Sequence, residues 1–303
     1  MEWMECERFL ALPNEELAQI VRASETKVCV FPFNGTRRWF LLEHAEKTRE
    51  NFVKAYIEET TRGYIHTYQL LFDHGIETVL APVFGSEILQ RGEEYMQQIG
   101  ASMGLLATHD EFLSFYEKYD VRVHFYGDYR KEFASTEYTY ITDQFDEVTR
   151  KTAGHKKHRL FYGVFASDAT QSIAELSILH YLKSKKTPTR QELIEAYYGE
   201  YIEKANVFIG FEKFSVFDYP MLNWGEESLY FTVAPSLYTT ARQLREMLYD
   251  HVYLRPIREP DYEKLQHKEV ELIRRFYEMN REKTLGTGEV RGGIWYPKSN
   301  IIE

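Results

Sequence analysis

The feature that most constrains the fold of this chain is an alternation between short apolar runs and longer helical stretches. Runs rich in β-branched and aromatic residues follow helical patterns in a regular order, which is typical of parallel strands joined by crossover helices. The expected strands are 27–33, 78–84, 121–127, 158–166, 206–211 and 229–234. The expected helices are 45–74, 86–104, 108–119, 138–152, 168–184, 189–203 and 236–250. The alternation predicts an α/β protein with a central, mostly parallel six-stranded sheet flanked by helices.

The length of 303 residues is enough for one large α/β domain or for two small ones. No repeat, low-complexity tract or linker forces a division. After Pro256 the composition turns charged, a further helix is expected over 261–283, and clustered glycines then indicate a loop-rich tail. We therefore predict a single domain over 1–303, with a core at about 26–256 and a C-terminal extension at about 257–303.

The charge and the cysteine content exclude several classes of protein. With a formal net charge of −10, the chain should repel nucleic acid. It has no apolar run near the ~20 residues that a membrane span needs, and its acidic N-terminus is unlike a signal peptide. We expect a soluble, cytoplasmic protein. Cys6 and Cys29 have no partners at metal-ligand spacing, which argues against a disulfide framework and a zinc site.

The segment after the first expected strand has the composition of an anion-binding loop. In an open α/β sheet, ligands bind beyond the carboxyl ends of the strands. Asn34–Arg38 occupies that position. Gly35 lets the backbone approach a ligand closely, and the adjacent Arg37 and Arg38 supply forked donors suited to phosphate oxygens. By spacing alone, a solvated basic turn explains the segment equally well.

A family resemblance decides between these two interpretations. The run Phe33–Trp39 resembles the Asp-Gly-Asn-(Arg/Gly)-Arg-Trp signature of cis-prenyltransferases, the family of undecaprenyl diphosphate synthase. Further matches to that family follow in order at Val83–Glu87, Val121–Asp128 and Leu229–Thr232. Together they cover about residues 26–256. The resemblance implies the cis-prenyltransferase fold, an isoprenoid diphosphate substrate and, because such enzymes are commonly homodimers, a homodimer.

A second set of segments is similar to a diverged branch of this family that acts on tuberculosinyl-type, bicyclic diterpenyl diphosphates. The segments are Val30–Phe40, His74–Val79, Tyr197–Tyr201, Tyr230–Ser236 and Tyr249–His251. The similarity runs nearly from end to end. It implies a terpenyl diphosphate transferase or hydrolase that ionises an allylic C–O bond and releases diphosphate. Water would then capture the cation to give an alcohol, or adenosine would capture it to give a terpenyl nucleoside.

The resemblance also implies roles for individual residues. The residues implied to bind the diphosphate are Gly35, Thr36, Arg37, Arg38 and Arg91. The residues implied to act in catalysis are Asn34, Tyr56 and Tyr95. Each tyrosine would hydrogen-bond the leaving group or face the cation. The alternatives are an exposed helix arginine at position 91 and packing tyrosines on amphipathic helices.

Asn34 departs from both related groups, which carry an aspartate there. Asparagine keeps the hydrogen bonds but loses the charge and the ability to accept a proton. Either the protein uses another base, or the chain is an Asp→Asn variant that holds substrate without turning it over. The intact flanking residues favour the second explanation.

The site for a second diphosphate is missing. Chain-elongating members hold isopentenyl diphosphate with an Arg-x-x-x-x-x-Arg-x-Ser pattern, which aligns here with Gly210, Val216 and Asp218. Two cations and a hydroxyl group are therefore absent, which argues against chain elongation. Two alternatives stay open: a chain-elongating cis-prenyltransferase, and a non-catalytic partner subunit of one. The first predicts that isopentenyl diphosphate enters longer products, and the second predicts no turnover by the isolated chain.

A magnesium site is only weakly indicated. The metal-associated glutamate of the family aligns with Ser228, although Glu226 and Glu227 lie next to it. We therefore assign no metal ligands and leave Mg²⁺ dependence open.

Overall fold

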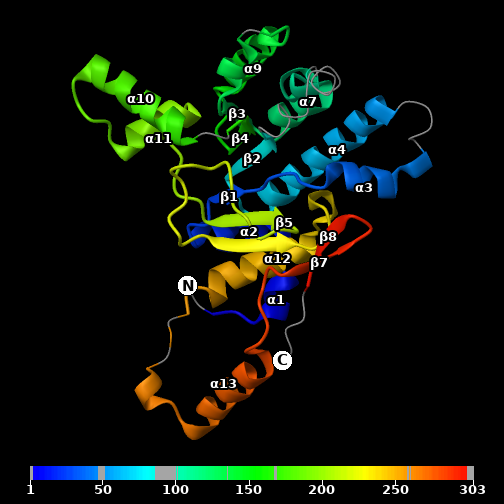
Figure 1. The fold of residues 1–303 in the computed structure, drawn as a ribbon, viewed down its shortest axis with the longest axis vertical. Helices are drawn as coiled ribbons and strands as arrows, with labels where there is room; N and C mark the ends of the chain where they lie inside the picture. The colour runs from blue at the N-terminus through cyan, green and yellow to red at the C-terminus, as the bar shows by residue number, and fades with distance from the viewer. Residues whose placement is uncertain are drawn as a thin grey trace.

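The computed structural model describes residues 3–46, 52–85, 100, 102–134, 136–166, 169–257, 259 and 261–298. Six strands form one sheet in the order β3-β4-β2-β1-β5-β6 (Figure 1). The strands are β1 Val28–Val30, β2 Thr78–Phe84, β3 Val121–Tyr126, β4 His158–Val164, β5 Val207–Phe211 and β6 Ser228–Thr232. All of these strand pairs are parallel. The predicted fold class is confirmed, and the sheet is wholly rather than mostly parallel.

The strand order places a topological switch point at β1. From β1 the chain moves to β2 on one side, whereas β5 pairs with β1 on the other side. In sheets of this kind, ligands bind in the crevice outside the carboxyl ends of the strands where the order reverses. The carboxyl ends of β1 and β5 therefore mark the expected position of a binding site.

Helices cover both faces of the sheet. They are α1 Cys6–Leu10, α2 Asn14–Ala23, α3 Thr36–Glu43, α4 Phe52–Asp73, α6 Leu105–Thr108, α7 Asp110–Lys118, α8 Tyr129–Phe133, α9 Thr139–Thr152, α10 Ala169–Ser184, α11 Arg190–Tyr198, α12 Ala241–Tyr249 and α13 His267–Asn280. The larger apolar core includes buried residues of α2, α4, α7, α9 and α12. A second core lies on the other face and includes Ile194 and Tyr198 of α11. All three residues of β1 are fully buried, as a central parallel strand requires.

Several helix boundaries differ from the sequence prediction. The helix expected over 189–203 ends at Tyr198, because Gly199 adopts φ +84° and stops it in the manner of a C-cap glycine. The helix expected over 236–250 begins as a 3₁₀ turn at Ser236–Tyr238, and the α-helix starts after a capping box at Thr240. The helix expected over 86–104 lies mostly outside the described residues.

The N-terminal residues belong to the main core, although no helix was expected there. Phe9 of α1 and Leu17 and Val21 of α2 are fully buried in the larger core. Arg245 of α12 donates to the carbonyl oxygens of Leu10 and Leu12, at 2.5 and 2.8 Å. These contacts extend the core below residue 26.

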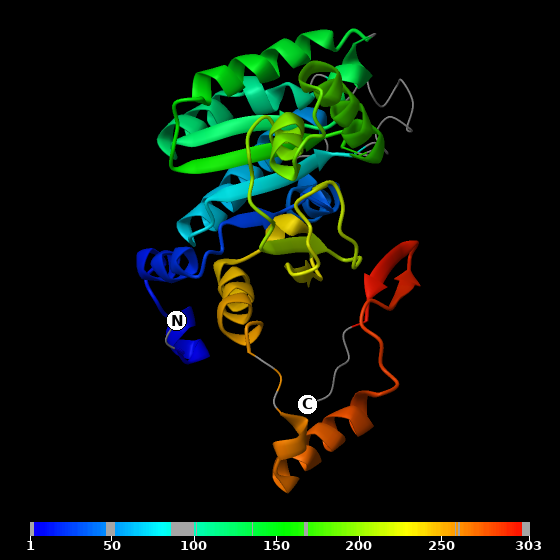
Figure 2. The ribbon, with the colours of Figure 1, turned by 90° about the vertical axis from the view of Figure 1, so that its left-hand side faces the viewer.

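The C-terminal extension lies apart from the sheet. Figure 2 shows α13 at the foot of the molecule and the β7–β8 hairpin reaching back from it. The hairpin pairs Gly288–Arg291 with Ile294–Pro297 in antiparallel register. No side chain of α13, a helix described throughout, is buried. Within the described part of the chain, no helix is long and apolar enough to cross a membrane.

Candidate active site

The predicted anion-binding segment lies at the switch point, directly beyond β1. The Asn34 N–H group donates to the Ser236 hydroxyl at 3.0 Å, and the Ser236 N–H group donates to the Asn34 carbonyl at 3.1 Å. The Ser236 hydroxyl donates in turn to the carbonyl of Pro32 at 3.2 Å. These bonds join two segments about 200 residues apart and fix the turn that follows β1.

This segment is a turn followed by a helix, so the prediction of a loop over 34–38 was wrong beyond Gly35. Gly35 adopts φ +73° and is the N-cap of α3, and Thr36, Arg37 and Arg38 form the first turn of that helix. Glycine is favoured at such a φ because a Cβ atom would be strained there. The start of a helix carries a positive partial charge and points backbone N–H groups outward, which suits a bound anion.

The two arginines have different environments. Arg37 is exposed. Arg38 is half-buried, and its Nη1 atom lies 3.0 Å from Oε1 of Glu212. Its guanidinium also lies 5.4 Å from the centre of the Phe211 ring. Arg38 is therefore held between the two residues at the end of β5, with further N–H donors left for a ligand.

Tyr56, for which the resemblance implies a catalytic role, lies beside the start of α3. Its hydroxyl oxygen is 2.8 Å from that of Thr36. Its ring stacks on Phe52 with centroids 5.9 Å apart and meets Phe40 edge-on at 5.4 Å. The hydroxyl group thus reaches the predicted diphosphate-binding segment, while the ring belongs to an aromatic cluster that could line the path of an apolar chain.

Tyr64 is a further residue of this region that sequence reasoning missed. Burial raises its pKa far above the ordinary value, the neighbouring Tyr56 raises it further, and a hydrogen bond with Thr36 opposes the shift. The ring stacks on Phe33 with centroids 4.0 Å apart. A pattern could have indicated it, because Tyr56 and Tyr64 are eight residues apart on one helix and so lie on the same face.

A cavity of about 310 Å³ opens beside Asn34. Its lining residues come from the two strand ends at the switch point: Asn34, Gly35, Arg38, Gly210, Phe211, Glu212, Lys213, Ser215 and Phe217. The volume is at the small end of the range for ligand sites. Sequence reasoning missed Glu212, and the available signal was its place directly after the strand that pairs with β1.

The positions that would hold isopentenyl diphosphate offer no cation. Gly210 lies inside β5, where a Cβ atom would come within 2.8 Å of the Phe208 and Phe231 rings. Val216 is 41% exposed, and Asp218 is an anion in the loop that follows. A strand position packed this tightly cannot accommodate an arginine, which agrees with the predicted absence of a second diphosphate site.

Two predicted residues, Arg91 and Tyr95, lie outside the described residues. The remaining six come together around the start of α3: Asn34, Gly35, Thr36, Arg37 and Arg38 on the turn and helix, and Tyr56 beside them.

The residues considered for a metal ion do not form a metal site. Ser228 shares a 2.8 Å hydrogen bond with Nδ1 of His251. Glu227 accepts a hydrogen bond from the Tyr219 hydroxyl at 2.9 Å, and Glu226 contacts Lys204. Among the described residues there is no group of three or more acidic, histidine or cysteine side chains that could hold an ion. These residues do not fit a Mg²⁺ site, and we derive no step through one.

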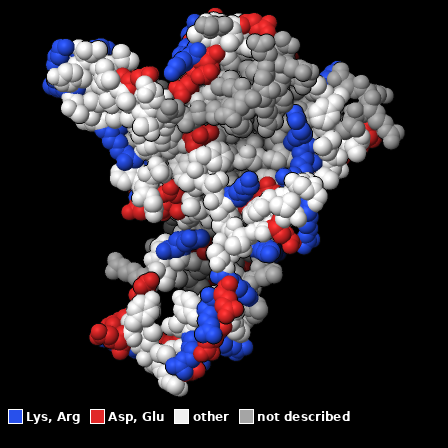
Figure 3. Space-filling view, in the orientation of Figure 1, with Lys and Arg blue, Asp and Glu red and all other residues white. Residues whose placement is uncertain are grey.

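Two other features are not part of the cavity lining. A hollow of about 640 Å³ is lined only by residues of the C-terminal extension, including Phe276 and Leu285. On the face in Figure 3, basic and acidic side chains are mixed along the foot of the molecule, so that region has no field of one sign.

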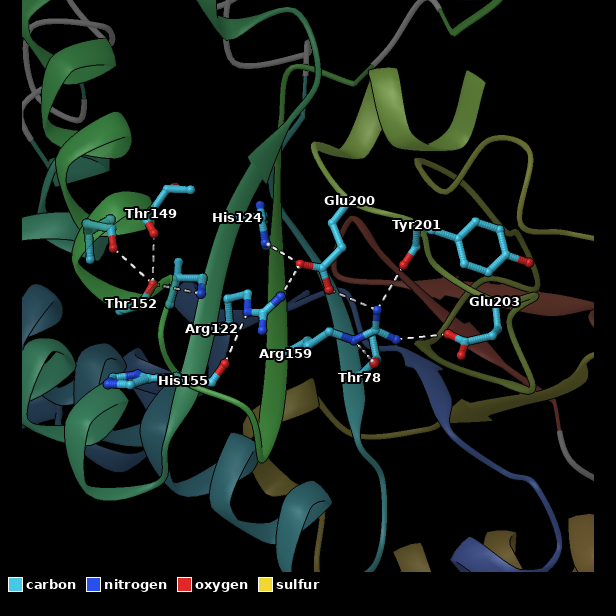
Figure 4. A network of polar contacts seen from close by, with 12 residues as sticks. Thr78, Arg122, His124, Thr149, Thr152, His155, Arg159, Glu200, Tyr201 and Glu203 are labelled. Carbon is cyan, nitrogen blue, oxygen red and sulfur yellow. Dashed lines mark hydrogen bonds and ion pairs between the residues drawn. The ribbon is translucent and has the colours of Figure 1, made fainter. Parts of the chain in front are cut away.

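A polar network near the amino ends of β3 and β4 has a structural role (Figure 4). Arg122 binds Glu200 at 2.6 Å, and Arg159 binds Glu200 at 3.1 Å and Glu203 at 2.8 Å. His124 lies 3.2 Å from the same Glu200 carboxylate. The network ties the loop after α11 to the sheet.

Comparison with known structures identifies the class of protein. The chain matches a lavandulyl diphosphate synthase from Lavandula x intermedia, solved in complex with dimethylallyl diphosphate, with a TM-score of 0.57 and 11% identity over 78% of this chain and 98% of that one. It matches a probable undecaprenyl diphosphate synthase from Campylobacter jejuni with a TM-score of 0.55 and 13% identity, over 78% and 98% of the two chains. At these identities only the fold is shared. The protein therefore has the cis-prenyltransferase fold.

Sequence comparison identifies the family. The chain is 46% identical over 290 residues to a tuberculosinyl adenosine transferase of Mycobacterium tuberculosis, covering 95% of this chain and 96% of the relative. It is 25% identical over 300 residues to a (+)-kolavelool synthase of Herpetosiphon aurantiacus, covering 97% and 96%. No model of a known protein family matches the chain. The protein belongs to the tuberculosinyl adenosine transferase family.

Proposed function

We propose that this protein ionises a bicyclic diterpenyl diphosphate, releases diphosphate, and lets a neutral acceptor capture the allylic cation. Water would give a terpene alcohol, and adenosine would give a terpenyl nucleoside. The observation that carries the proposal is the start of α3 at the β1 switch point, where Gly35 caps a first helix turn that holds two arginines. The 46% identical relative is named for transfer of a tuberculosinyl group to adenosine.

The site suits the departure of a single diphosphate. As the C–O bond breaks, negative charge grows on the leaving group, so cations and helix N–H groups stabilise the transition state more than the bound substrate. Arg38 and the helix start supply both. The Thr36 and Tyr56 hydroxyl groups share a hydrogen bond of 2.8 Å, and whichever of them accepts in it would donate its own O–H to a diphosphate oxygen. Arg91 and Tyr95 keep the roles that the family resemblance implies.

The aromatic residues next to the helix start support an allylic cation as the intermediate. Tyr56, Phe40 and Phe52 pack together beside Thr36, and the ring of Tyr64 stacks on Phe33 behind them. The faces of aromatic rings attract cations. A terpenyl chain lying against these rings would have its diphosphate at the start of α3.

Asn34 is proposed to slow ionisation relative to an aspartate. The amide keeps a polar group at the cavity but provides no negative charge beside the cation and no proton acceptor. This holds whether asparagine is the natural residue or a substitution.

We propose a homodimer as the assembly of the protein, on the basis of family resemblance. Sedimentation velocity of the purified chain would test it, because a monomer at micromolar concentrations would contradict it.

The deciding experiment measures both products of the reaction. The chain is incubated with bicyclic and linear allylic diphosphates, with and without adenosine, while released diphosphate is measured enzymatically and terpenoid products by mass spectrometry. The proposal expects diphosphate release from a bicyclic substrate and an alcohol or terpenyl nucleoside in equal amount. Incorporation of isopentenyl diphosphate into longer chains would instead show an elongating enzyme.

A further inference from the structure

We infer that Glu212 binds the neutral nucleophile that captures the allylic cation. Its carboxylate also stabilises the positive charge that forms on the nucleophile when the new bond is made. The inference rests on the proposed function and deepens it, because it assigns the cavity beside Asn34 to the acceptor.

The position of Glu212 makes it the carboxylate of the cavity. It follows β5 directly and lines the same cavity as Asn34 and Gly35, which follow β1. Its side chain is 13% exposed. Among the described residues that line the cavity, Glu212 is the one acidic side chain. Asn34 is an amide and cannot accept a proton, so Glu212 is the residue of this cavity lining that can act as a base.

The backbone holds this carboxylate at the end of β5. Glu212 adopts φ +66°, a conformation that is uncommon outside glycine and strained for a residue with a Cβ atom. The Lys213 N–H group donates to the Phe211 carbonyl at 2.8 Å across it, which forms a three-residue turn. The Glu212 N–H group donates to the Thr232 carbonyl at 2.9 Å, which anchors the turn to β6.

The pairing with Arg38 links the departure of diphosphate to the capture of the cation by the nucleophile. Oε1 of Glu212 lies 3.0 Å from Nη1 of Arg38, the proposed diphosphate-binding arginine. Among the described residues, this is the one hydrogen bond made by the Glu212 carboxylate. Its Oε2 atom can therefore accept a hydrogen bond from an N–H or O–H group of the nucleophile. Arg38 would thus lie between the leaving diphosphate and the carboxylate, and its hydrogen bond orients Glu212.

The Glu212 carboxylate favours a neutral acceptor beside it. Arg38 and Lys213 also line the cavity, but Arg38 is paired with Glu212, and a second diphosphate next to the carboxylate would be repelled by it. A donor N–H or O–H group is favoured there instead, and Phe211 and Phe217 provide apolar ring surface next to it. Water and the amino-substituted ring of adenosine both meet these requirements.

The chemical step balances without a metal or a co-reactant. The allylic C–O bond breaks and both electrons leave with the diphosphate. A lone pair on the acceptor then forms the new C–O or C–N bond and places a positive charge on the attacking atom. Where that atom carries a proton, as in water, the proton passes to Glu212. Where it carries none, as in a ring nitrogen, the carboxylate stabilises the cationic product.

The test separates ionisation from capture in the full-length protein. Glu212→Gln keeps the size of the side chain and removes its charge. Glu226→Gln is the matched control, because Glu226 is an exposed, ion-paired residue that does not line the cavity. With a bicyclic diterpenyl diphosphate and adenosine, we measure released diphosphate, captured products and hydrocarbons formed when the cation loses a proton instead. Glu212→Gln is expected to lower the captured-to-hydrocarbon ratio at least about tenfold, and Glu212→Asp to restore part of it.

Other outcomes would overturn the inference. If Glu212→Gln raises the KM for the terpenyl diphosphate and leaves the captured-to-hydrocarbon ratio unchanged, Glu212 serves only to position Arg38. A binding measurement provides a second readout: calorimetric titration of adenosine into protein saturated with inorganic diphosphate should give a Kd at least tenfold higher for Glu212→Gln than for the control. Equal Kd values would place the acceptor elsewhere. If the unmodified chain releases no diphosphate from any terpenyl substrate, the proposed function itself fails.

Discussion

Asn34 sets the first prediction at the scale of a single residue. Its backbone is fixed by two hydrogen bonds to Ser236, so the turn does not depend on the side chain. Asn34→Asp should therefore leave the fold unchanged and place a negative charge beside the developing cation. We expect turnover to rise by about tenfold or more, measured as diphosphate released per minute from a bicyclic diterpenyl diphosphate. Asn223→Asp, at an exposed loop position, is the control for the added charge.

The same substitution tests the two explanations of the asparagine. If Asn34→Asp turns over no faster than the unmodified chain, a base elsewhere already serves the reaction, and the Glu212 carboxylate becomes the main candidate. Combining Asn34→Asp with Glu212→Gln then reports whether the two carboxylates act on the same step, because effects on independent steps would be additive.

At the scale of secondary-structure elements, Gly35 determines how α3 begins. Its φ of +73° costs a residue with a Cβ atom about 1–2 kcal/mol, and that atom would lie 2.8 Å from the Phe211 ring and 3.0 Å from Pro235. Gly35→Ala should lower the free energy of unfolding by at least that amount and reduce activity, because the helix start must shift. Gly154→Ala is the matched control, since nothing lies within 4 Å of its added methyl group.

Chemical denaturation and diphosphate release would be measured on both glycine variants. A Gly35→Ala protein as stable and active as the Gly154→Ala protein would show that the turn after β1 adjusts freely. The position of the helix start would then contribute little to binding.

The sequence predicted the sheet well because its strands are central and parallel. Because such strands are buried on both faces, their sequences are continuous apolar runs, which are typical of a central parallel strand. The family motif indicated a diphosphate-binding role for the segment after β1, which stays a prediction. It did not indicate that Thr36 begins a helix, because adjacent arginines and a tryptophan give no apolar period. Glu212 was missed for a physical reason: its role depends on β5 pairing with β1, a contact between residues about 180 positions apart.

At the scale of the whole molecule, we expect the C-terminal extension to be separable from the sheet. None of the fully described residues of α13 is buried, and the extension approaches the body where Gly286 lies near the Phe214 ring. A chain ending at Ile257 should give nearly the same circular dichroism signal per residue as the full chain. Its Tm should lie within a few degrees of that of the full chain. Loss of cooperative unfolding would instead place the extension in the folding unit, as a single domain over the whole chain requires.

The buried histidines give the molecule a predictable response to acid. Burial lowers the pKa of His158 to about 4, against an ordinary value of 6.5, and it also lowers the pKa values of His74, His124 and His251. The His158 ring stacks on Phe72 with centroids 4.2 Å apart, in surroundings that do not favour a charge. These groups therefore bind protons more readily in the unfolded chain than in the folded one.

The difference in proton binding between the folded and unfolded chain decides how the free energy of unfolding depends on pH. Between about pH 6.5 and 4 the unfolded chain holds more protons, so the free energy of unfolding must fall as the pH is lowered through that window. His158 alone would contribute roughly 3 kcal/mol of this loss, because its pKa is about 4 in the folded chain and 6.5 in the unfolded one. Urea denaturation at several pH values should show that loss, and His158→Phe should remove part of it while keeping the stack on Phe72. His267→Gln, at an exposed position, should leave the pH dependence unchanged. A pH dependence equal in all three proteins would mean that His158 can be protonated without unfolding, and that the acid response comes from the other buried groups.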